Sequence, residues 1–343
     1  MAKVDACVTV IVTCFNLERF IAESIQSVLD QNFRGSIELI VVDDCSTDKS
    51  VEIIRQFPEA RYLNTAENSG VLLATIAGIE AASNDLLFFL DGDDLWAPEK
   101  VQSVFDRFRA DPLLAFATHD LWYANEGGEV LDRETRPAQC LTPVPQAGMS
   151  EALRQGILNQ TDYVWLGSAM AIRASVANAA GFCAWAKKLP DPRNTYQDWP
   201  LAFWVAADPD SRLDYVADKL FRYRLHGMNY SGDAGTAAKA ARNIRRSLNT
   251  ALAMKEIADL QQLSPALIRQ LHSRANFYGY LAALYVGDRR SAWVGFMRSL
   301  KFLRQRRMLV KEISRFAGIQ LLGPDRFARL SGRRHFFRRL RQA

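Results

Sequence analysis

Three apolar runs in the first hundred residues end in polar residues, and this pattern constrains the fold more than any other feature of the chain. The runs are VTVIVT, IELIVV and LLFFL, at residues 8–13, 37–42 and 86–90. Their β-branched and aromatic composition is typical of strands buried on both faces. A shorter strand is expected at 60–65, and apolar residues at helical spacing fill the intervals. Strands that alternate with helices predict an α/β fold with a mainly parallel sheet flanked by helices.

The polar clusters that follow these runs predict a ligand site. Thr13–Asn16, Asp43–Asp44 and Asp91–Asp94 each stand directly after or at the end of a strand. In open α/β sheets, ligands bind beyond the carboxyl ends of the strands, where such residues meet. The chain has no GxGxxG after the first strand and no P-loop sequence, which argues against a dinucleotide fold and a P-loop enzyme. The convergence favours a nucleotide cleft over three unrelated turns.

The segment FFLDGDDLW at residues 88–96 carries the most specific of these clusters. Asp91 and Asp93 point to one side if the strand persists, so they can share a cation or divide metal and ribose contacts. Gly92 between them leaves room for close backbone approach. Carboxylate oxygens suit hard divalent ions, so Mg²⁺ or Mn²⁺ is expected rather than zinc. A solvated turn is the alternative, because Asp and Gly are common turn residues.

The segment CSTDKSVEII that follows the second run reads as a helix start. Ser46 or Thr47 is the expected N-cap. Further on, residues 120–165 are less regular, and from Gly235 onward the pattern is almost wholly helical. The length of 343 residues allows two domains, or one large domain with an appendage.

The end of the chain is strongly basic. Residues 286–343 contain 16 Lys and Arg and three Asp and Glu, whereas residues 1–285 carry a net charge of −8. Such a tail seeks phosphates, in lipid head groups or in nucleic acid. The acidic remainder argues against nucleic acid, because it would repel the same phosphates.

An apolar stripe runs through the first part of this tail, among its basic residues. A basic amphipathic helix can lie in an anionic membrane interface. The alternative is a helix that packs its stripe on the catalytic domain. The stripe consists of Trp293, Phe296, Met297, Leu300 and Leu303.

Cysteine usage and the lack of long apolar runs predict a location. The five cysteines are scattered without a CxxC pair, which indicates a reducing compartment and argues against structural zinc or disulfides. No run approaches the roughly 18 apolar residues of a membrane-spanning helix, and none resembles a signal peptide. We therefore expect a cytoplasmic protein, with peripheral contact to the inner face of the membrane through the tail.

Four segments resemble, in order and spacing, the successive motifs of family 2 glycosyltransferases. They are VTVIVTCFNLERFIAESIQSVLDQ, ELIVVDDCSTDKS, NTAENSG and LLFFLDGDDLWAPEKV. The resemblance is strong over residues 6–105 and weaker to about 232. It implies the GT-A fold, and transfer of a sugar from a nucleotide diphosphate sugar with inversion, using a divalent metal.

Carried over residue by residue, the resemblance implies a nucleoside pocket. Thr13 and Asn16 would line it, and Asn68 and Gly70 would border it. Asp44 would accept a hydrogen bond from the base, which favours a UDP- or dTDP-sugar because uracil and thymine share the N3–H donor. Asn16 and Asp44 could instead be strand-end caps.

The resemblance also assigns the acids after the third apolar run. Asp91 and Asp93 would face ribose and metal, with Asp94 as a neighbour able to bind the ion. One departure concerns the helix after NSG, where relatives often carry an Arg-Asn pair and this chain has Thr75 and Ile76. The departure leaves open which base or phosphate geometry is read.

Two later segments resemble further parts of the family site. TYQDWPLAFWVA resembles the segment that supplies the catalytic base, which implies Asp198. Asp198 before Pro200 also fits a helix N-cap, and the base role requires its carboxylate to face the cleft. YRLHGMNYS resembles a loop whose histidine reaches the metal or diphosphate, so His226 is a candidate metal ligand. A lone histidine is otherwise more often structural.

These observations together predict an inverting, metal-dependent glycosyltransferase. A GT-A catalytic domain would occupy residues 1–232, with its nucleotide-sugar half at about 1–105 and its acceptor half at about 106–232, followed by a basic helical region at 233–343. The acceptor would be a saccharide, plausibly lipid-linked and used in cell-surface polysaccharide synthesis. A catalytically silent sugar-nucleotide binder and a basic-tailed nucleic-acid binder are the alternatives.

Overall fold

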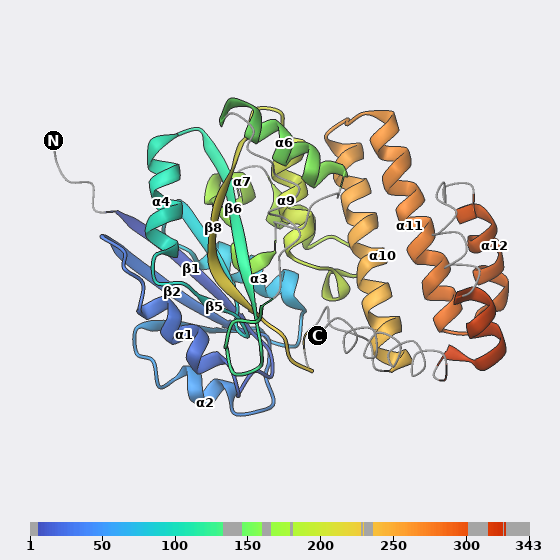
Figure 1. Cartoon of the computed structure of the whole chain (residues 1–343), viewed down its shortest axis with the longest axis horizontal. Helices are drawn as coiled ribbons and strands as arrows, with labels where there is room; N and C mark the ends of the chain where they lie inside the picture. The colour runs from blue at the N-terminus through green and yellow to red at the C-terminus, as the bar shows by residue number, and fades with distance from the viewer. Residues whose placement is uncertain are drawn as a thin grey trace. The chain divides into compact units, whose positions relative to one another are not determined.

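The computed structural model describes residues 6–132, 146–159, 166–178, 181–227, 229, 236–300, 315–324 and 326. The chain divides into two compact units, residues 1–226 and 227–343 (Figure 1). The division falls close to the expected boundary at 232. The assignment of the two units as a catalytic domain and a basic extension stays a prediction.

The first unit is built on one mixed sheet. Its strands are β1 (Cys7–Cys14), β2 (Ser36–Asp43), β3 (Ala60–Asn64), β4 (Leu86–Asp91), β5 (Leu95–Trp96), β6 (Leu114–Ala124), β7 (Ala171–Arg173) and β8 (Arg212–Arg224). They lie in the order β3-β2-β1-β4-β7-β6-β8-β5. The pairs among β1 to β4 and the pair β6–β8 are parallel, whereas β7 and β5 run antiparallel to their partners. The expected α/β fold with a mainly parallel sheet is confirmed.

Helices cover this sheet and connect its strands (Figure 1). They are α1 (Ile21–Leu29), α2 (Ser50–Ile54), α3 (Val71–Ala81), α4 (Lys100–Ala110), α6 (Gln146–Asn159), α7 (Ala174–Asn178), α8 (Phe182–Ala186) and α9 (Asp198–Ala207), with the short turns η1 (Gly167–Ala169) and η2 (Pro192–Asn194). The start of α2 differs from the prediction, because its N-cap is Lys49 and no side chain caps it. Ser46 and Thr47 instead bind Asn16: Ser46 Oγ accepts from its N–H and Thr47 N–H donates to its Oδ1, both at 2.8 Å.

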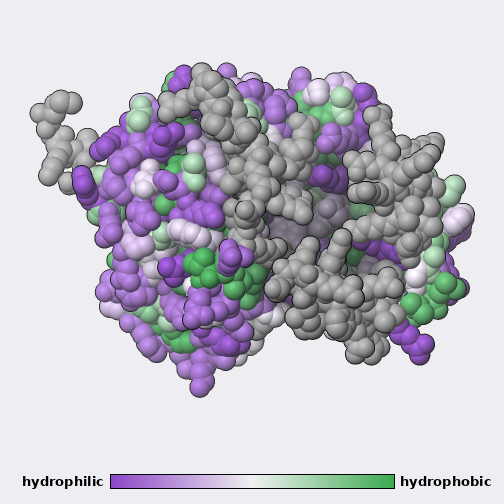
Figure 2. Space-filling model, in the orientation of Figure 1, coloured by the Kyte–Doolittle hydropathy of each residue, from purple (hydrophilic) through white to green (hydrophobic). Residues whose placement is uncertain are grey.

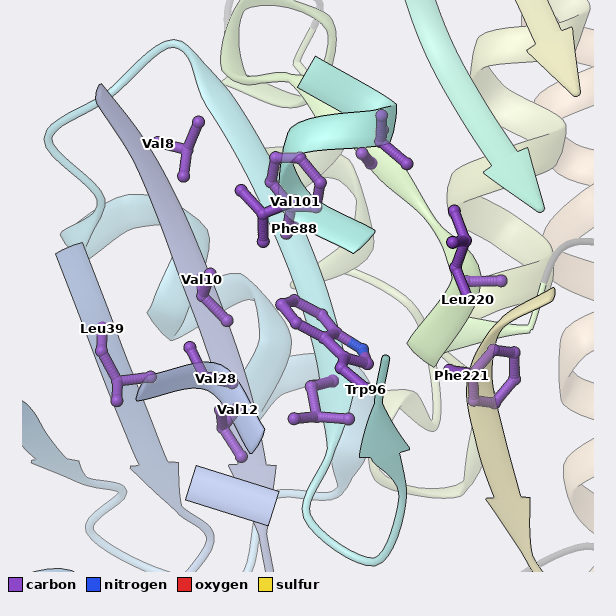
Figure 3. Packing of buried hydrophobic residues seen from close by; sticks show 14 of the residues in the cluster. Val8, Val10, Val12, Val28, Leu39, Phe88, Trp96, Val101, Leu220 and Phe221 are labelled. Carbon is purple, nitrogen blue, oxygen red and sulfur yellow. The ribbon is translucent and has the colours of Figure 1, made fainter. Parts of the chain in front are cut away.

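The core of this unit follows from the two-residue period of β1. Val8, Val10 and Val12 point to one face, where they pack with Val28 of α1 and Val101 of α4 (Figure 3). All five side chains are fully buried. The packing of alternate residues of β1 under the helices fixes the strand, and with it the position of the polar residues at its end.

The opposite face of β1 is covered by α3. Ile11 points to this face, and a Cβ on Gly78 of α3 would lie 2.3 Å from Ile11 Cγ2. Glycine at this position therefore lets α3 approach the sheet closely. Helices cover both faces of the layer, and the strand ends form one of its edges.

Strand register brings the polar clusters to that edge. Thr13 of β1 pairs in register with Asp91 of β4, and Cys14 pairs with Asp43 of β2. The antiparallel pairing of β4 with β7 brings η1, which directly precedes β7, to the same edge. The convergence predicted from the sequence is thus a consequence of parallel pairing.

The second unit is helical, as the sequence predicts. It contains α10 (Ala237–Leu260), α11 (Pro265–Tyr285), α12 (Arg289–Leu300) and a helical segment at 315–322. Buried residues from α11, α12 and this last segment share one core: Tyr280, Leu281, Leu284, Ala292, Phe296 and Ile319. Within the described ranges, no helix is both long and apolar enough to cross a membrane.

The predicted apolar stripe is divided between the inside and the outside of this unit. Phe296 is buried and stacks on Phe316, with ring centroids 4.8 Å apart, whereas Trp293 and Met297 are about half exposed. Leu321 and Leu322 are also exposed. Figure 2 shows hydrophobic patches, in green, among the mostly hydrophilic surface on the face that it draws. The side chain of Leu300, Leu303 and the basic residues at 301–314 and 327–343 lie outside the described residues. Phe296 is therefore a packing residue of the second unit.

Candidate active site

Asp91, the last residue of β4, stands at the centre of the strand-end cluster. Gln197 Nε2 donates to its Oδ1 at 2.6 Å, and Thr13 Oγ1 lies 3.5 Å from the same oxygen. Its backbone N–H donates to Ser168 Oγ at 3.0 Å. Residues from β1, η1 and the turn before α9 therefore meet at one residue at the end of β4.

Asp94 is anchored by the protein itself. It is 1% exposed; its Oδ2 accepts from Ser168 Oγ at 2.6 Å, and its Oδ1 accepts from the backbone N–H of Arg224 at 3.0 Å. Burial and the charges of Asp93 and Asp91 raise the pKa of Asp94. Because both oxygens are already engaged, the geometry favours an anchoring role, and metal binding by Asp94 stays a prediction.

Asp93 contacts His226, as expected if both residues bind the metal. His226 Nε2 lies 3.0 Å from Asp93 Oδ2, although 133 residues separate the two in the chain. The imidazole is held against the ring of Phe20, with centroids 4.4 Å apart. The Asp93 side chain is 19% exposed and that of His226 is 1% exposed. Solvent therefore reaches the pair from the carboxylate side.

Asp198 is the first residue of α9, and the cap position belongs to Gln197. The Asp198 Oδ1 accepts from the backbone N–H of Trp199 at 2.9 Å. The N-cap alternative is thus not the arrangement found. The charge of Asp198 contributes to the raised pKa of Asp91, so the two residues lie near one another, and the role of Asp198 as the base stays a prediction.

Like Asp94, two further carboxyls of this cluster have strongly raised pKa values. The pKa of Asp91 rises to about 7 through burial and the charges of Asp93 and Asp198. Burial also raises the pKa of Asp198 to about 7. Within the described residues, neither forms an ion pair with a lysine or arginine. The cluster therefore concentrates negative charge that a bound cation would relieve.

The donor set fits a divalent ion that is shared with a ligand. No group of three or more His, Cys, Asp or Glu side chains in the described ranges is placed to hold a metal alone. Mg²⁺-type sites commonly use one or two carboxylates and complete the shell with substrate phosphates. Asp93, partly exposed and beside the His226 imidazole, offers such a partial site.

At the end of β2, the carboxylate of Asp44 accepts several hydrogen bonds from one loop. Asp44 Oδ1 accepts from Ser69 N–H at 2.7 Å, Ser69 Oγ at 2.8 Å and Thr65 Oγ1 at 2.9 Å, and its Oδ2 accepts from Gly70 N–H at 2.8 Å. The carboxylate thereby fixes the loop that contains Asn68 to β2. Its predicted contact with a base stays a prediction, and would have to share Oδ2 with Gly70.

Gly70 and Asn16, near the ends of β2 and β1, have positive backbone φ angles. Gly70 has φ of 87°, and a Cβ there would lie 2.3 Å from the carbonyl oxygen of Arg193, so only glycine fits. Asn16 has φ of 54°, a conformation that asparagine tolerates, and its Oδ1 is engaged with Thr47. The side chain of Asn16 thus caps the end of the strand, which was one of the two roles considered for it. Contacts with the nucleoside stay predictions for Thr13, Asn16, Asn68 and Gly70.

Sequence reasoning missed two residues of the cluster, Gln197 and Ser168. Gln197 links Asp91 to Thr75, whose Oγ1 donates to Gln197 Oε1. Ser168 binds the backbone of Asp91 and the carboxyl of Asp94. Gln197 stood beside the predicted base and could have been suspected, whereas no motif marked Ser168.

Comparison with known proteins agrees with this arrangement. The model of glycosyl transferase family 2 matches residues 9–177. A putative teichuronic acid biosynthesis glycosyltransferase of Bacillus subtilis, TuaG, is 31% identical over 139 residues, which cover 39% of this chain and 54% of the relative. The chain thus spans about half the length of that relative.

Two solved structures share the fold. TarS 1–349 of S. aureus in complex with UDP-GlcNAc has a TM-score of 0.58 at 15% identity, covering 80% of this chain and 73% of that one. The mannosyltransferase PcManGT of Pyrobaculum calidifontis, in complex with GDP-Man and Mn²⁺, has a TM-score of 0.52 at 17% identity, covering 95% and 83%. The sequence motifs, the sheet and the family match lead to one conclusion: this chain belongs to glycosyl transferase family 2 and has the GT-A fold.

Proposed function

We propose that this chain is an inverting, metal-dependent glycosyltransferase that moves a sugar from a UDP- or dTDP-sugar to a hydroxyl group of a saccharide acceptor. The observation that carries the proposal is that the start of α9 lies against the end of β4: Gln197 binds the carboxylate of Asp91, and the charge of the next residue, Asp198, raises the pKa of Asp91. These acids are 107 residues apart in the chain, and each has a pKa of about 7. Perturbed carboxyls at the carboxyl end of a sheet are typical of a catalytic site.

Asp198 is the general base of this proposal. Inversion requires the acceptor hydroxyl to attack from the side opposite the leaving group, and a carboxylate there takes the hydroxyl proton as the bond forms. A base is most effective when its pKa lies near the working pH, and that of Asp198 is about 7.

The residues at the ends of β1 and β2 are the proposed nucleoside wall. Thr13 and Asn16 would contact the nucleoside, Asn68 and Gly70 would border it, and Asp44 would accept from its base. A uridine or thymidine donor is favoured by an acceptor oxygen at Asp44. The complex of TarS with UDP-GlcNAc supports a uridine donor, whereas that of PcManGT with GDP-Man shows that the fold also serves guanosine.

Asp93 and His226 would hold the divalent ion, with oxygens of the donor diphosphate completing its shell. Asp91 would contact the ribose or the same ion, and Asp94 would support both acids from behind. When bound, Mn²⁺ or Mg²⁺ supplies charge that stabilises the leaving nucleotide diphosphate. The Mn²⁺ in the PcManGT complex supports this choice of metal.

The acceptor is proposed to be a lipid-linked saccharide of a cell-surface polysaccharide. The name of the teichuronic acid relative supports this class of product. The excess of 16 basic over three acidic residues at 286–343 supports work at an anionic membrane. Trp293 and Met297, both exposed on α12, would enter the interface.

A ligand screen tests the proposal and separates it from the silent binder. Thermal stabilisation by UDP-, dTDP-, GDP- and CDP-sugars, with and without MnCl₂, should be largest for a UDP- or dTDP-sugar with the metal. A ligand at about 100 times its Kd stabilises by close to 2.7 kcal/mol. Slow release of free sugar from the best donor supports the enzyme. Stabilisation without any hydrolysis or transfer supports the silent binder, and preference for GDP or CDP overturns the role of Asp44.

A further inference from the structure

Ser168 connects the two ends of the acidic turn after β4 with a single hydroxyl group. Its Oγ accepts from the backbone N–H of Asp91 at 3.0 Å and donates to Asp94 Oδ2 at 2.6 Å. The turn is closed by its own bond, in which Asp94 N–H donates to Asp91 C=O at 2.9 Å. A hydroxyl has one donor and two acceptor sites, so both contacts of Ser168 form at once. Asp93 lies between the two residues that this hydroxyl fixes.

The main chain of Ser168 is held from behind by buried donors. Its carbonyl oxygen accepts from Trp96 Nε1 at 3.2 Å and from Lys100 Nζ. Ser168 and Lys100 are 0% exposed, and the Lys100 ammonium lies 3.8 Å from the centre of the Trp96 ring. A lysine is seldom fully buried unless it is paired, and the partners of this one are the Ser168 carbonyl, the Trp96 ring and the nearby charge of Asp94. The position of Ser168 is therefore fixed independently of the acidic turn.

The residue before Ser168 faces the carboxylate of Asp91 directly. A Cβ on Gly167 would lie 2.7 Å from Gln197 Nε2 and 3.3 Å from Asp91 Oδ2. Glycine thus leaves the carboxylate of Asp91 and the amide of Gln197 in contact. Gly167 leaves room for the side chain of Asp91, and Ser168 binds the main chain of the same residue.

We propose that Ser168 is a positioning residue of the metal and diphosphate site. Held by Trp96 and Lys100, its hydroxyl sets the turn that presents Asp93 to His226 and to the ion. The inference rests on the proposed function, because it takes Asp93 as the metal-binding acid. Groups that orient metal ligands typically change metal affinity or activity by about 10–100-fold when removed.

The test measures UDP binding by calorimetry on the full chain, with and without MnCl₂, for three variants. Ser168→Ala removes the hydroxyl, and Ser168→Thr keeps it. Ser211→Ala is the matched control, because Ser211 is also buried and donates to a carboxylate, that of Asp208 at 2.7 Å, at the other end of α9. Melting temperatures of all variants are recorded beside the binding data.

For Ser168→Ala, the account predicts that Mn²⁺-dependent UDP affinity falls about 10–100-fold, while UDP binding without the metal changes by less than about threefold. Ser168→Thr should recover most of the affinity, and Ser211→Ala should bind as the unaltered chain does. Full Mn²⁺-dependent affinity in Ser168→Ala overturns the inference, as does a threonine variant that is as weak as the alanine variant. Equal losses with and without Mn²⁺ also overturn it, since they mean a merely structural role.

Asp93→Ala, measured in the same series, separates the inference from the function on which it rests. Loss of Mn²⁺-dependent binding in Asp93→Ala but not in Ser168→Ala overturns only the role of Ser168. Unchanged binding in Asp93→Ala overturns the proposed metal site, and the inference with it.

Discussion

The ends of β2 and β4 lie at one edge of the same sheet, yet their carboxylates have opposite environments. Asp44 receives four hydrogen bonds from the loop after β3. Asp91 receives one close bond from Gln197 and is crowded by the charges of Asp93 and Asp198. The first carboxylate is compensated within the protein, whereas the second is not.

The contrast indicates that Asp44, at the end of β2, has a structural role, whereas Asp91, at the end of β4, belongs to the part of the site that performs the chemistry. A carboxylate surrounded by N–H and O–H donors fixes a loop, and its oxygens already have partners within the protein. Carboxylates that repel one another store unfavourable energy, which a cation or a proton relieves. We therefore expect substitutions at β4 and α9 to change catalysis, and substitutions at β2 to change stability.

The largest expected effect is that of Asp198→Asn. The amide keeps the shape of the side chain but cannot take the acceptor proton, so kcat should fall by roughly 10²–10⁴-fold. UDP affinity in the presence of Mn²⁺ should stay within about twofold, since a base acts in the transition state. Asp208→Asn, at the other end of α9, is the matched control. A near-normal kcat in Asp198→Asn would return this residue to a structural role.

Asp93→Ala should have the next largest effect, and on binding rather than on the chemical step. Loss of the carboxylate beside His226 removes a proposed ligand of the ion, so Mn²⁺-dependent donor affinity should fall about 10–100-fold. Calorimetry with UDP at several MnCl₂ concentrations measures this loss. Asp218→Ala, an exposed acid on β8, should behave as the unaltered chain. If the two variants bind alike, Asp93 is not a metal ligand.

Asp44→Asn should act mainly on stability. Its amide nitrogen would face at least one N–H donor of the loop, so we expect a loss of about 2 kcal/mol, in the range found for hydrogen bonds to charged groups. Urea unfolding of the variant measures this loss. The ratio of UDP to GDP affinity then tells whether Asp44 also reads the base. If this ratio falls by more than about tenfold while stability is unchanged, Asp44 binds the base and has no structural role, which would contradict the difference drawn between Asp44 and Asp91.

The smallest effect is expected in the second unit, at the membrane. The unaltered chain should bind vesicles that contain phosphatidylserine and not vesicles of phosphatidylcholine alone, because each basic residue near an anionic surface contributes about 1 kcal/mol. Trp293→Ser should weaken that binding several-fold, whereas the buried Phe296 is needed for folding of the unit. Cosedimentation with both vesicle types is the measurement. Equal binding to both types would show that the tail charge is not the cause.

Sequence patterns were enough to predict the sheet and the position of its acids. Parallel strands end at one edge, so Thr13 and Asp91 were expected at the same edge of the sheet. The structure adds that β1 and β4 are adjacent, which makes the two residues neighbours. His226 could be placed beside the metal acids only through the family resemblance, because no spacing rule relates it to Asp93. Their distance of 3.0 Å agrees with that expectation.

The supporting residues could not be predicted in the same way. Ser168 acts through a hydroxyl that reaches Asp91 only because β7 pairs antiparallel with β4, a pairing that a three-residue strand does not announce. The expected cap at Ser46 failed for a related reason, since its hydroxyl serves a loop 30 residues away. Polar side chains that bind distant backbone leave no local pattern.

The pH dependence of kcat tests the central claim, that Asp198 is the catalytic base, most directly. Burial raises its pKa to about 7, so the carboxyl keeps its proton, and is inactive as a base, below that pH. With saturating donor and MnCl₂, kcat should rise about tenfold per pH unit up to about pH 7 and stay level above it. The residual activity of Asp198→Asn should lack this rise. A kcat that is level from about pH 5.5 to 9, or a rise that persists in Asp198→Asn, would contradict the account.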